Sequence, residues 1–232
     1  MAEQKERVSL RVWLLVLVFI VAIPCLPLLI TRRWDWWEAW VYAAITILGF
    51  AISRWLAARQ HPDLLAERAQ FMRQDDTEHW DKVLAPLSGL GGALIPLVAG
   101  LDALLRKPEP FGLTAKIVIL AIIFAGYVVA SAALIANRFF SGTVRIQAER
   151  GQHVVTGGPY RWVRHPGYAG ALLTYWATPV LLDSLWAYLP VIFLTIVLVV
   201  RTSLEDKTLQ ERLEGYEDYA SRVPHRLIPG LW

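Results

Sequence analysis

The feature that most constrains this chain is a series of long apolar runs with almost no charge. A helix needs about 20 mostly apolar residues to cross ~30 Å of hydrocarbon. Runs of this kind occupy residues 12–30, 37–58, 83–105, 113–136, 168–182 and 185–200. The mean hydropathy of +0.41 makes the alternative, a soluble helical protein with a tryptophan-rich core, less favoured. We therefore expect an all-α fold, a polytopic transmembrane helical bundle of about six spans whose last two form a C-terminal helical hairpin.

The basic residues lie mostly on one side of the membrane that this span count defines. The N-terminus, the polar segments 59–82 and 137–167 and the C-terminal tail share that side, together with Arg54 near the end of the second run. It holds 18 of the 23 Lys and Arg residues. Positively charged segments remain in the cytoplasm. We therefore expect a multi-pass integral membrane protein whose termini and active site, built from these polar segments, are cytoplasmic.

No repeat, low-complexity segment or Gly/Ser linker divides the chain, so we expect a single membrane domain over residues 1–232. Residues 1–136 would supply four N-terminal spans. Residues 137–232 would supply two spans, a cytoplasmic C-terminal helix and a cofactor pocket. The net charge of +3 gives no case for nucleic acid, and the single cysteine and the histidine spacing give no case for a metal site. No span centre carries the ionisable residues of a transport pathway.

The polar segment with the most candidate functional residues is 152–170, which lies just before and at the start of the fifth run. Gly157-Gly158-Pro159 predicts a turn, and Pro166 suits the first position of a helix. The free amides of a first helical turn can bind a ligand. A more common interpretation is a basic juxtamembrane loop in which Arg161 and Arg164 contact lipid phosphates. These residues alone leave both interpretations open.

A second candidate lies at the end of the sixth run, where Arg201 and Glu205 are four residues apart. This spacing places both side chains on one face of a helix that continues past the membrane through Asp206 and Leu209. Most such pairs are minor surface ion pairs worth about 0.2–0.5 kcal/mol. In isolation, the pair predicts no function.

Taken together, the motifs of this chain resemble the isoprenylcysteine carboxyl methyltransferase family, including its prokaryotic relatives. The resemblance covers roughly residues 145–232. It rests on Gly158-Pro-Tyr160, Arg164-His-Pro-Gly-Tyr-Ala-Gly170, Arg201-x-x-x-Glu205, Gly215-Tyr-Glu-Asp-Tyr219 and Val223-Pro-His-Arg-Leu-Ile-Pro229. Upstream, His61–Arg68 and Trp80–Val83 match more weakly. One departure is Asp206, where many relatives have a second Glu.

The resemblance implies an enzyme that uses S-adenosylmethionine and no metal. It implies that Arg201 and Glu205 are catalytic, that Arg201 binds the substrate carboxylate and that Glu205 also contacts the cofactor. The other cofactor-binding residues that it implies are Gln147, His153, Val154, Val155, Tyr160, His165, Pro166, Gly167 and Tyr168. The acceptor would be a lipophilic small molecule or lipidated substrate that arrives from the membrane lipids, such as a prenylcysteine-like or other lipid carboxylate.

Two alternative activities remain open. A phospholipid N-methyltransferase or a small-thiol S-methyltransferase would share the His-Pro-x-Tyr pattern. The ending Tyr-x-x-Tyr followed by Val-Pro-x-Arg-x-Ile-Pro also resembles membrane sterol reductases, which use NADPH. We rank the reductase lower because the Arg201/Glu205 pair and Gly158-Pro-Tyr160 fit the methyltransferases better.

Overall fold

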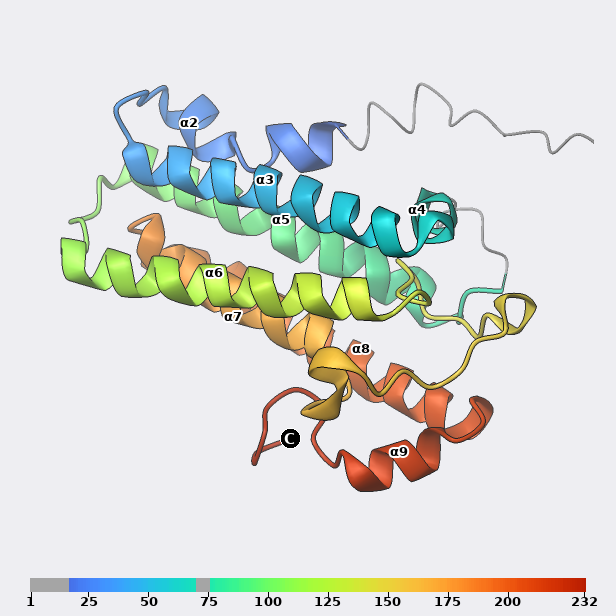
Figure 1. Ribbon diagram of the computed structural model, residues 1–232. Coiled ribbons are helices and arrows are strands. Elements are labelled where there is room, and N and C mark those ends of the chain that lie inside the picture. The colour runs from blue at the N-terminus through green and yellow to red at the C-terminus, as the bar shows by residue number, and fades with distance from the viewer. Residues whose placement is uncertain (1–16, 70–75) are drawn as a thin grey trace, which may run out of the picture.

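Helices form the regular structure of the computed structural model, which describes residues 17–69 and 76–232 (Figure 1). The long helices are α3 (Trp37–Gln60), α5 (Asp81–Leu105), α6 (Leu113–Ala136), α7 (Pro166–Leu181) and α8 (Tyr188–Arg212). The shorter helical elements are η1 (Val18–Ala22), α2 (Leu26–Thr31), α4 (Pro62–Ala69), η3 (Ala148–Arg150), η4 (Gly158–Arg161), η5 (Leu185–Ala187) and α9 (Tyr216–Arg222). The predicted all-α bundle is confirmed.

Within the described ranges, 4 helices are long and apolar enough to cross a membrane: Trp37–Gln60, Asp81–Leu105, Leu113–Ala136 and the combined helix Leu185–Arg212. The expected first span lies partly outside these ranges. Its described part is broken between η1 and α2, where Pro24 and Pro27 prevent a continuous hydrogen-bond ladder. The expected fifth span is α7, whose 16 residues reach only about 24 Å at 1.5 Å per residue.

The expected C-terminal hairpin is present, because α7 and α8 run antiparallel and are joined by the short turn and η5 (Figure 1). The hairpin is asymmetric. Helix α8 continues to Arg212, well beyond the apolar run that ends at residue 200. Its polar last turns therefore project beyond the apolar part of the bundle, toward α9.

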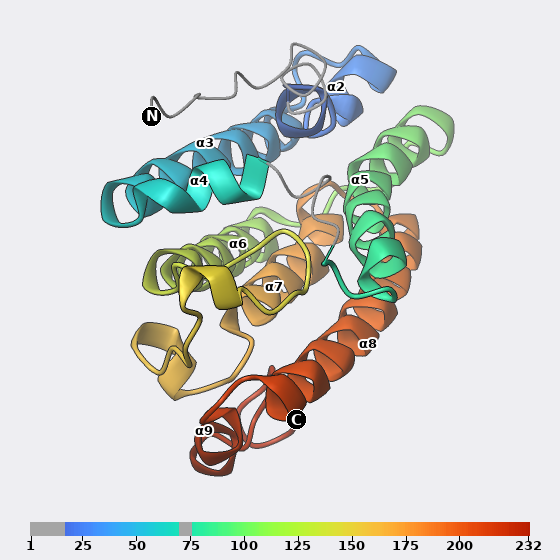
Figure 2. The same ribbon diagram turned by 90° about the vertical axis from the view of Figure 1, so that its right-hand side faces the viewer.

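Figure 2 shows how the long helices pair, with α6 beside α7 and α5 beside α8. The α6–α7 crossing is close because Gly126 and Gly170 face each other. A Cβ atom on Gly126 would lie 2.4 Å from Thr174 Oγ1, and one on Gly170 would lie 2.5 Å from Gly126 O. Small residues of this kind let two membrane helices approach backbone to backbone. This contact fixes the start of α7 relative to the end of α6.

The described parts of the polar segments 59–82, 137–167 and 201–232 gather at one end of the bundle (Figure 1). The opposite end is closed by a buried ion cluster. Lys116 is 3% exposed and donates to Glu38 and, at 2.8 Å, to Asp183 Oδ2. A buried charge needs such partners, because leaving it unpaired costs several kcal/mol. The candidate chemistry is thus confined to the end where the polar segments meet.

Candidate active site

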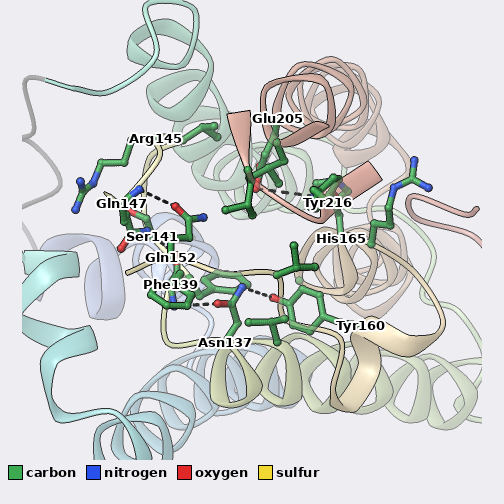
Figure 3. Close-up of a pocket in the computed structure, with 18 of the residues that line it drawn as sticks. Asn137, Phe139, Ser141, Arg145, Gln147, Gln152, Tyr160, His165, Glu205 and Tyr216 are labelled. Carbon is green, nitrogen blue, oxygen red and sulfur yellow. Dashed lines mark hydrogen bonds and ion pairs between the residues drawn. The ribbon is translucent and has the colours of Figure 1, made fainter. Parts of the chain in front are cut away.

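A pocket of about 200 Å³ lies where these polar segments converge (Figure 3). Its walls come from Arg68 of α4, the loop that follows α6, the 141–155 stretch, η4, the start of α7, the last turns of α8, and α9. Every residue that the family resemblance implies for cofactor or substrate lines it, except Pro166. The fold therefore brings together residues that are up to 58 positions apart in the sequence, from Gln147 to Glu205.

The start of α7 lies where the sequence predicts it. His165 is the N-cap, with a non-helical backbone, and Pro166 is the first helical residue, a common position for proline. Pro166 is buried outside the pocket lining, and its contribution is to set the direction of this helix start. The next residue, Gly167, has no room for a side chain, because a Cβ atom there would lie 2.7 Å from the Phe140 ring.

Tyr168 and Glu205 form a direct hydrogen bond within the pocket. The Tyr168 hydroxyl donates to Glu205 Oε2 at 2.7 Å. Glu205 Oε1 lies 3.9 Å from Nδ1 of His165, whose ring stacks on Tyr168 with centroids 6.0 Å apart. The carboxylate is 23% exposed and retains acceptor capacity toward the pocket. It is a suitable partner for a positively charged ligand.

The carboxylate of Asp206, the residue next to Glu205, is fully buried beside the pocket and binds residues from three parts of the chain. Its Oδ1 accepts from Arg164 Nε at 2.7 Å and its Oδ2 from Arg226 Nε at 2.9 Å. His165 Nε2 lies 3.2 Å from Oδ1, and Tyr216 donates to the same oxygen at 3.0 Å. Since an ionised carboxylate only accepts, His165 carries its proton on Nε2. Asp206 thus fixes the orientation of His165 and ties the C-terminal tail to α7.

The stretch after α6 is held by Gln147, which is 1% exposed. Its Nε2 donates to Phe139 O at 2.8 Å, and its backbone N–H donates to Gln152 Oε1 at 2.6 Å (Figure 3). Arg150 donates to Gln147 Oε1 and also to Asp63 in α4, at 2.6 Å. The Arg150 guanidinium holds the pKa of Asp63 at about 2. Gln147 therefore lines the pocket mainly as the centre of a loop network.

Tyr160 forms the floor together with aromatic side chains of α9. Its hydroxyl accepts from Asn137 Nδ2 at 3.2 Å, and Tyr219 donates to its backbone oxygen at 2.6 Å. Burial raises the pKa of Tyr160, and burial raises that of Tyr219 to about 12. Both phenols therefore remain protonated at neutral pH and act as hydrogen-bond donors.

The remaining implied residues build an apolar wall. Val154 and Val155 are half-buried and pack with Leu209 and Leu213 of the α8 end against the tyrosines of α9. The exposed His153 ring meets Phe139 edge to face, with centroids 5.0 Å apart. Such a wall suits a flat heteroaromatic group rather than a charged one.

Arg201 makes a contact that the sequence did not predict. Its Nε and Nη2 donate to Asp81 Oδ1 and Oδ2 at 2.7 and 2.9 Å, and Nη2 also donates to Gly142 O at 3.0 Å. Asp81 is fully buried and also accepts from Val144 N–H at 2.7 Å. In this structure the Nε and Nη2 edge of Arg201 is therefore occupied by Asp81, and its implied role in binding a substrate carboxylate stays a prediction. Only its Nη1 edge remains for a ligand.

Arg201 and Glu205 do not form the surface ion pair that their spacing most often indicates. Arg201 is 8% exposed and lies over the Tyr168 ring, 5.5 Å from its centroid. Both residues line the same pocket, so the helical spacing brings a cation and a carboxylate to one cavity wall.

Sequence reasoning missed several residues of this site. Asn137, Phe139 and the 141–145 stretch carry no motif that distinguishes them from an ordinary loop. Asp81 was available, because it lies in the weakly matching Trp80–Val83 segment, but nothing in the sequence pairs it with a residue 120 positions away. Among the described residues, no cluster of three or more His, Cys, Asp or Glu could hold a metal ion.

Several known proteins resemble part of this chain. A Delta(14)-sterol reductase of Mus musculus is 30% identical over 154 residues, which is 60% of this chain and 37% of that protein. A probable protein-S-isoprenylcysteine O-methyltransferase of Oryza sativa subsp. indica is 33% identical over 116 residues, 47% of this chain and 59% of that protein. A methanethiol S-methyltransferase of Crocosphaera subtropica is 39% identical over 71 residues, 30% of this chain and 27% of that protein. In each case the match spans less than two thirds of the relative.

The family match falls on the structural core of the pocket. It covers residues 114–211, from α6 through nearly all of α8, and so includes every residue that the motifs implied for cofactor and substrate. The resemblance that the motifs indicate is confirmed. Residues 114–211 of this chain match the model of the isoprenylcysteine carboxyl methyltransferase family.

Proposed function

We propose that this chain is an integral membrane methyltransferase that uses S-adenosylmethionine to methylate a lipophilic acceptor. The observation that carries the proposal is the convergence of Tyr168, Glu205, Arg201 and the 147–160 stretch on one pocket at the polar end of an apolar bundle. A polar donor can enter this pocket from water. A lipid acceptor can reach the same place from the membrane.

The pocket has the groups that such a methyl donor needs. S-adenosylmethionine supplies an activated methyl group on a sulfonium, and it also carries an ammonium, a carboxylate and an adenine ring. Glu205 offers a carboxylate with free acceptor capacity for the cationic part. Val154, Val155 and Leu209 supply an apolar wall for the ring. The side chains present thus fit the donor.

The protein's part in the reaction is positioning. Methyl transfer is an in-line displacement that requires the nucleophile at about 3–3.5 Å from the methyl carbon. A carboxylate acceptor is ionised at neutral pH, so no strong general base is needed. Arg201 can orient that carboxylate through its Nη1 edge while Asp81 holds the rest of the guanidinium in place. We therefore favour a prenylcysteine-like or other lipid carboxylate as the acceptor.

We further propose that the pocket and both termini face the cytoplasm. The polar segments at the pocket end contain most of the basic residues, which is the pattern of the cytoplasmic side. Reporter fusions at residues 1 and 232 test this orientation. A C-terminal reporter active on the outer side of the membrane would contradict it.

Binding measurements separate this function from its alternatives. Calorimetry on the purified protein should detect S-adenosylmethionine and S-adenosylhomocysteine, and Glu205→Gln should weaken both. If the protein binds NADPH but neither S-adenosylmethionine nor S-adenosylhomocysteine, the result would instead support a reductase, the activity named for the relative from Mus musculus. A panel of radiolabelled transfer assays with lipid acids, phospholipid amines and methanethiol then identifies the acceptor class.

A further inference from the structure

A second cavity, of about 250 Å³, lies inside the bundle. Five elements supply its walls: the turn after η1, α3, α5, α6 and α7. Its lining contains no charged residue, but it is rich in hydroxyl groups, from Tyr42, Thr46, Ser88, Tyr127, Thr174, Tyr175 and Thr178.

Helix α7 contributes residues to both this cavity and the active-site pocket. Tyr168 lines the active-site pocket and Tyr175 lines the second cavity, and both belong to α7. Seven residues are nearly two turns, so the two side chains lie on the same face, about 10 Å apart along the helix axis. Asp81 and Ser88 of α5 have the same spacing. Leu172, between the two tyrosines, packs with them against the same core cluster.

The hydroxyl groups differ in whether they already have a hydrogen-bond partner in the protein. Ser88, Thr174 and Thr178 each donate to a carbonyl of their own helix, at 2.8, 3.2 and 2.8 Å. Tyr42 and Tyr127 both interact with Thr46. Within the described part of the chain, the Tyr175 hydroxyl makes no hydrogen bond to protein. It is a donor that lines a cavity and still needs an acceptor.

Gly92 of α5 leaves room for the Tyr175 hydroxyl. A Cβ atom on Gly92 of α5 would lie 3.5 Å from the Tyr175 hydroxyl oxygen. The Tyr175 hydroxyl lines the cavity, and a hydroxyl donor left unpaired in apolar surroundings costs roughly 1–3 kcal/mol, so a group with an acceptor oxygen is favoured there. No charged side chain lines the cavity, although Arg54 of α3 interacts electrostatically with Tyr127 and Tyr175. A neutral group such as a ketone, ester, ether or hydroxyl needs no counter-charge from such a lining.

We propose that this cavity binds a neutral oxygen-bearing group of the acceptor lipid, about 10 Å from the carboxylate that is methylated. The proposal rests on the function proposed above and narrows its substrate class. The acceptor is then an oxygenated lipid acid, and the hydroxyl cluster, with Tyr175 as its free donor, selects it over a plain hydrocarbon chain of the same length.

The test uses two probes, octadecanoic acid and the same acid with a ketone about 10 Å from the carboxylate. Affinities are measured in lipid nanodiscs for the full chain and for Tyr175→Phe, which keeps the ring and removes the hydroxyl. We expect the wild type to prefer the keto acid by about three- to tenfold, the effect of one hydrogen bond, and Tyr175→Phe to lose that preference. Gly92→Ala, whose methyl group fits beside the hydroxyl without a clash, should reduce the preference as well.

Tyr188→Phe is the matched control, because Tyr188 packs on Trp176 outside both cavities. It should keep the wild-type preference. Equal affinity of the wild type for both probes, or an unchanged preference in Tyr175→Phe, overturns the proposal and leaves a cavity that holds water or plain chain. The binding readout needs no methyl transfer. If both acids are methylated but bind with equal affinity, only the proposed role of the cavity is refuted. If the keto acid binds more tightly but neither acid is methylated, only the proposed methyltransferase function is refuted.

Discussion

Replacing Asp81 by Asn tests the most consequential contact of the site. Asp81 is fully buried and receives two bonds from Arg201 and one from Val144 N–H. Asn keeps the size of the side chain but removes its charge and turns one acceptor into a donor. Arg201, whose side chain is 9% exposed, is then a buried cation without its counter-ion. Breaking such a pair costs about 3–5 kcal/mol of the free energy of unfolding.

The same change should impair catalysis more than folding. A total stability of roughly 5–15 kcal/mol survives the loss in most domains, so Asp81→Asn should be recoverable in the folded state. Without Asp81, neither Arg201 nor the loop at Val144 has a fixed position. A displacement of 1 Å at the reacting groups costs about 100-fold in rate. We expect kcat to fall by at least that factor.

Tryptophan-monitored thermal unfolding in detergent and steady-state methylation measure the two effects. Glu211→Gln is the control, because Glu211 forms an exposed pair with Lys207 and its loss should change stability by well under 1 kcal/mol. The double variant Asp81→Asn/Arg201→Gln removes both charges and should cost less than the sum of the single changes. Near-normal turnover and melting of Asp81→Asn would refute the assignment of Arg201 and Asp81 as a buried, coupled pair.

Three further outcomes follow from the geometry. Tyr168→Phe removes the bond to Glu205 and should weaken S-adenosylhomocysteine binding about three- to tenfold by calorimetry, with no change if the two side chains act independently. Asp206→Asn should lower the free energy of unfolding by more than about 3 kcal/mol and release the C-terminal tail. The release would be measured as faster amide hydrogen exchange over residues 223–232, and unchanged exchange there would contradict the role of Asp206 as an anchor. Gly126→Ala should destabilise the α6–α7 crossing strongly, whereas Gly89→Ala, with nothing within 4 Å of the new methyl group, should be neutral in thermal unfolding.

Most of the residues that the motifs single out line one pocket, and they could be found from the sequence because they lie in short, locally structured motifs. Gly157-Gly158-Pro159 and His165-Pro166 determine backbone conformation within a few residues. The helical spacing of Arg201 and Glu205 places them on one face without reference to the rest of the fold. Their convergence on a common pocket with Tyr160 and Tyr168 agrees with the resemblance, whereas the roles of the individual residues remain predictions.

The number of spans was predicted less well. Hydropathy counts apolar residues but does not report where a helix breaks or how long it is. Pro24 and Pro27 interrupt the first apolar run, and α7 begins and ends within 16 residues. Hydropathy alone could not distinguish these short elements from full spans.

The sequence by itself determined the helical class, the polar segments and the residues of the motifs, because these depend on composition and on neighbours within a few positions. The partner of each buried charge depends instead on how the helices pack. Arg201 is paired with Asp81 of α5, and Asp206 is paired with Arg164 and Arg226 from the segments before α7 and after α9. Such pairings are set by the crossing of helices far apart in the chain, since a buried charge must take the counter-ion that packing brings within 3 Å.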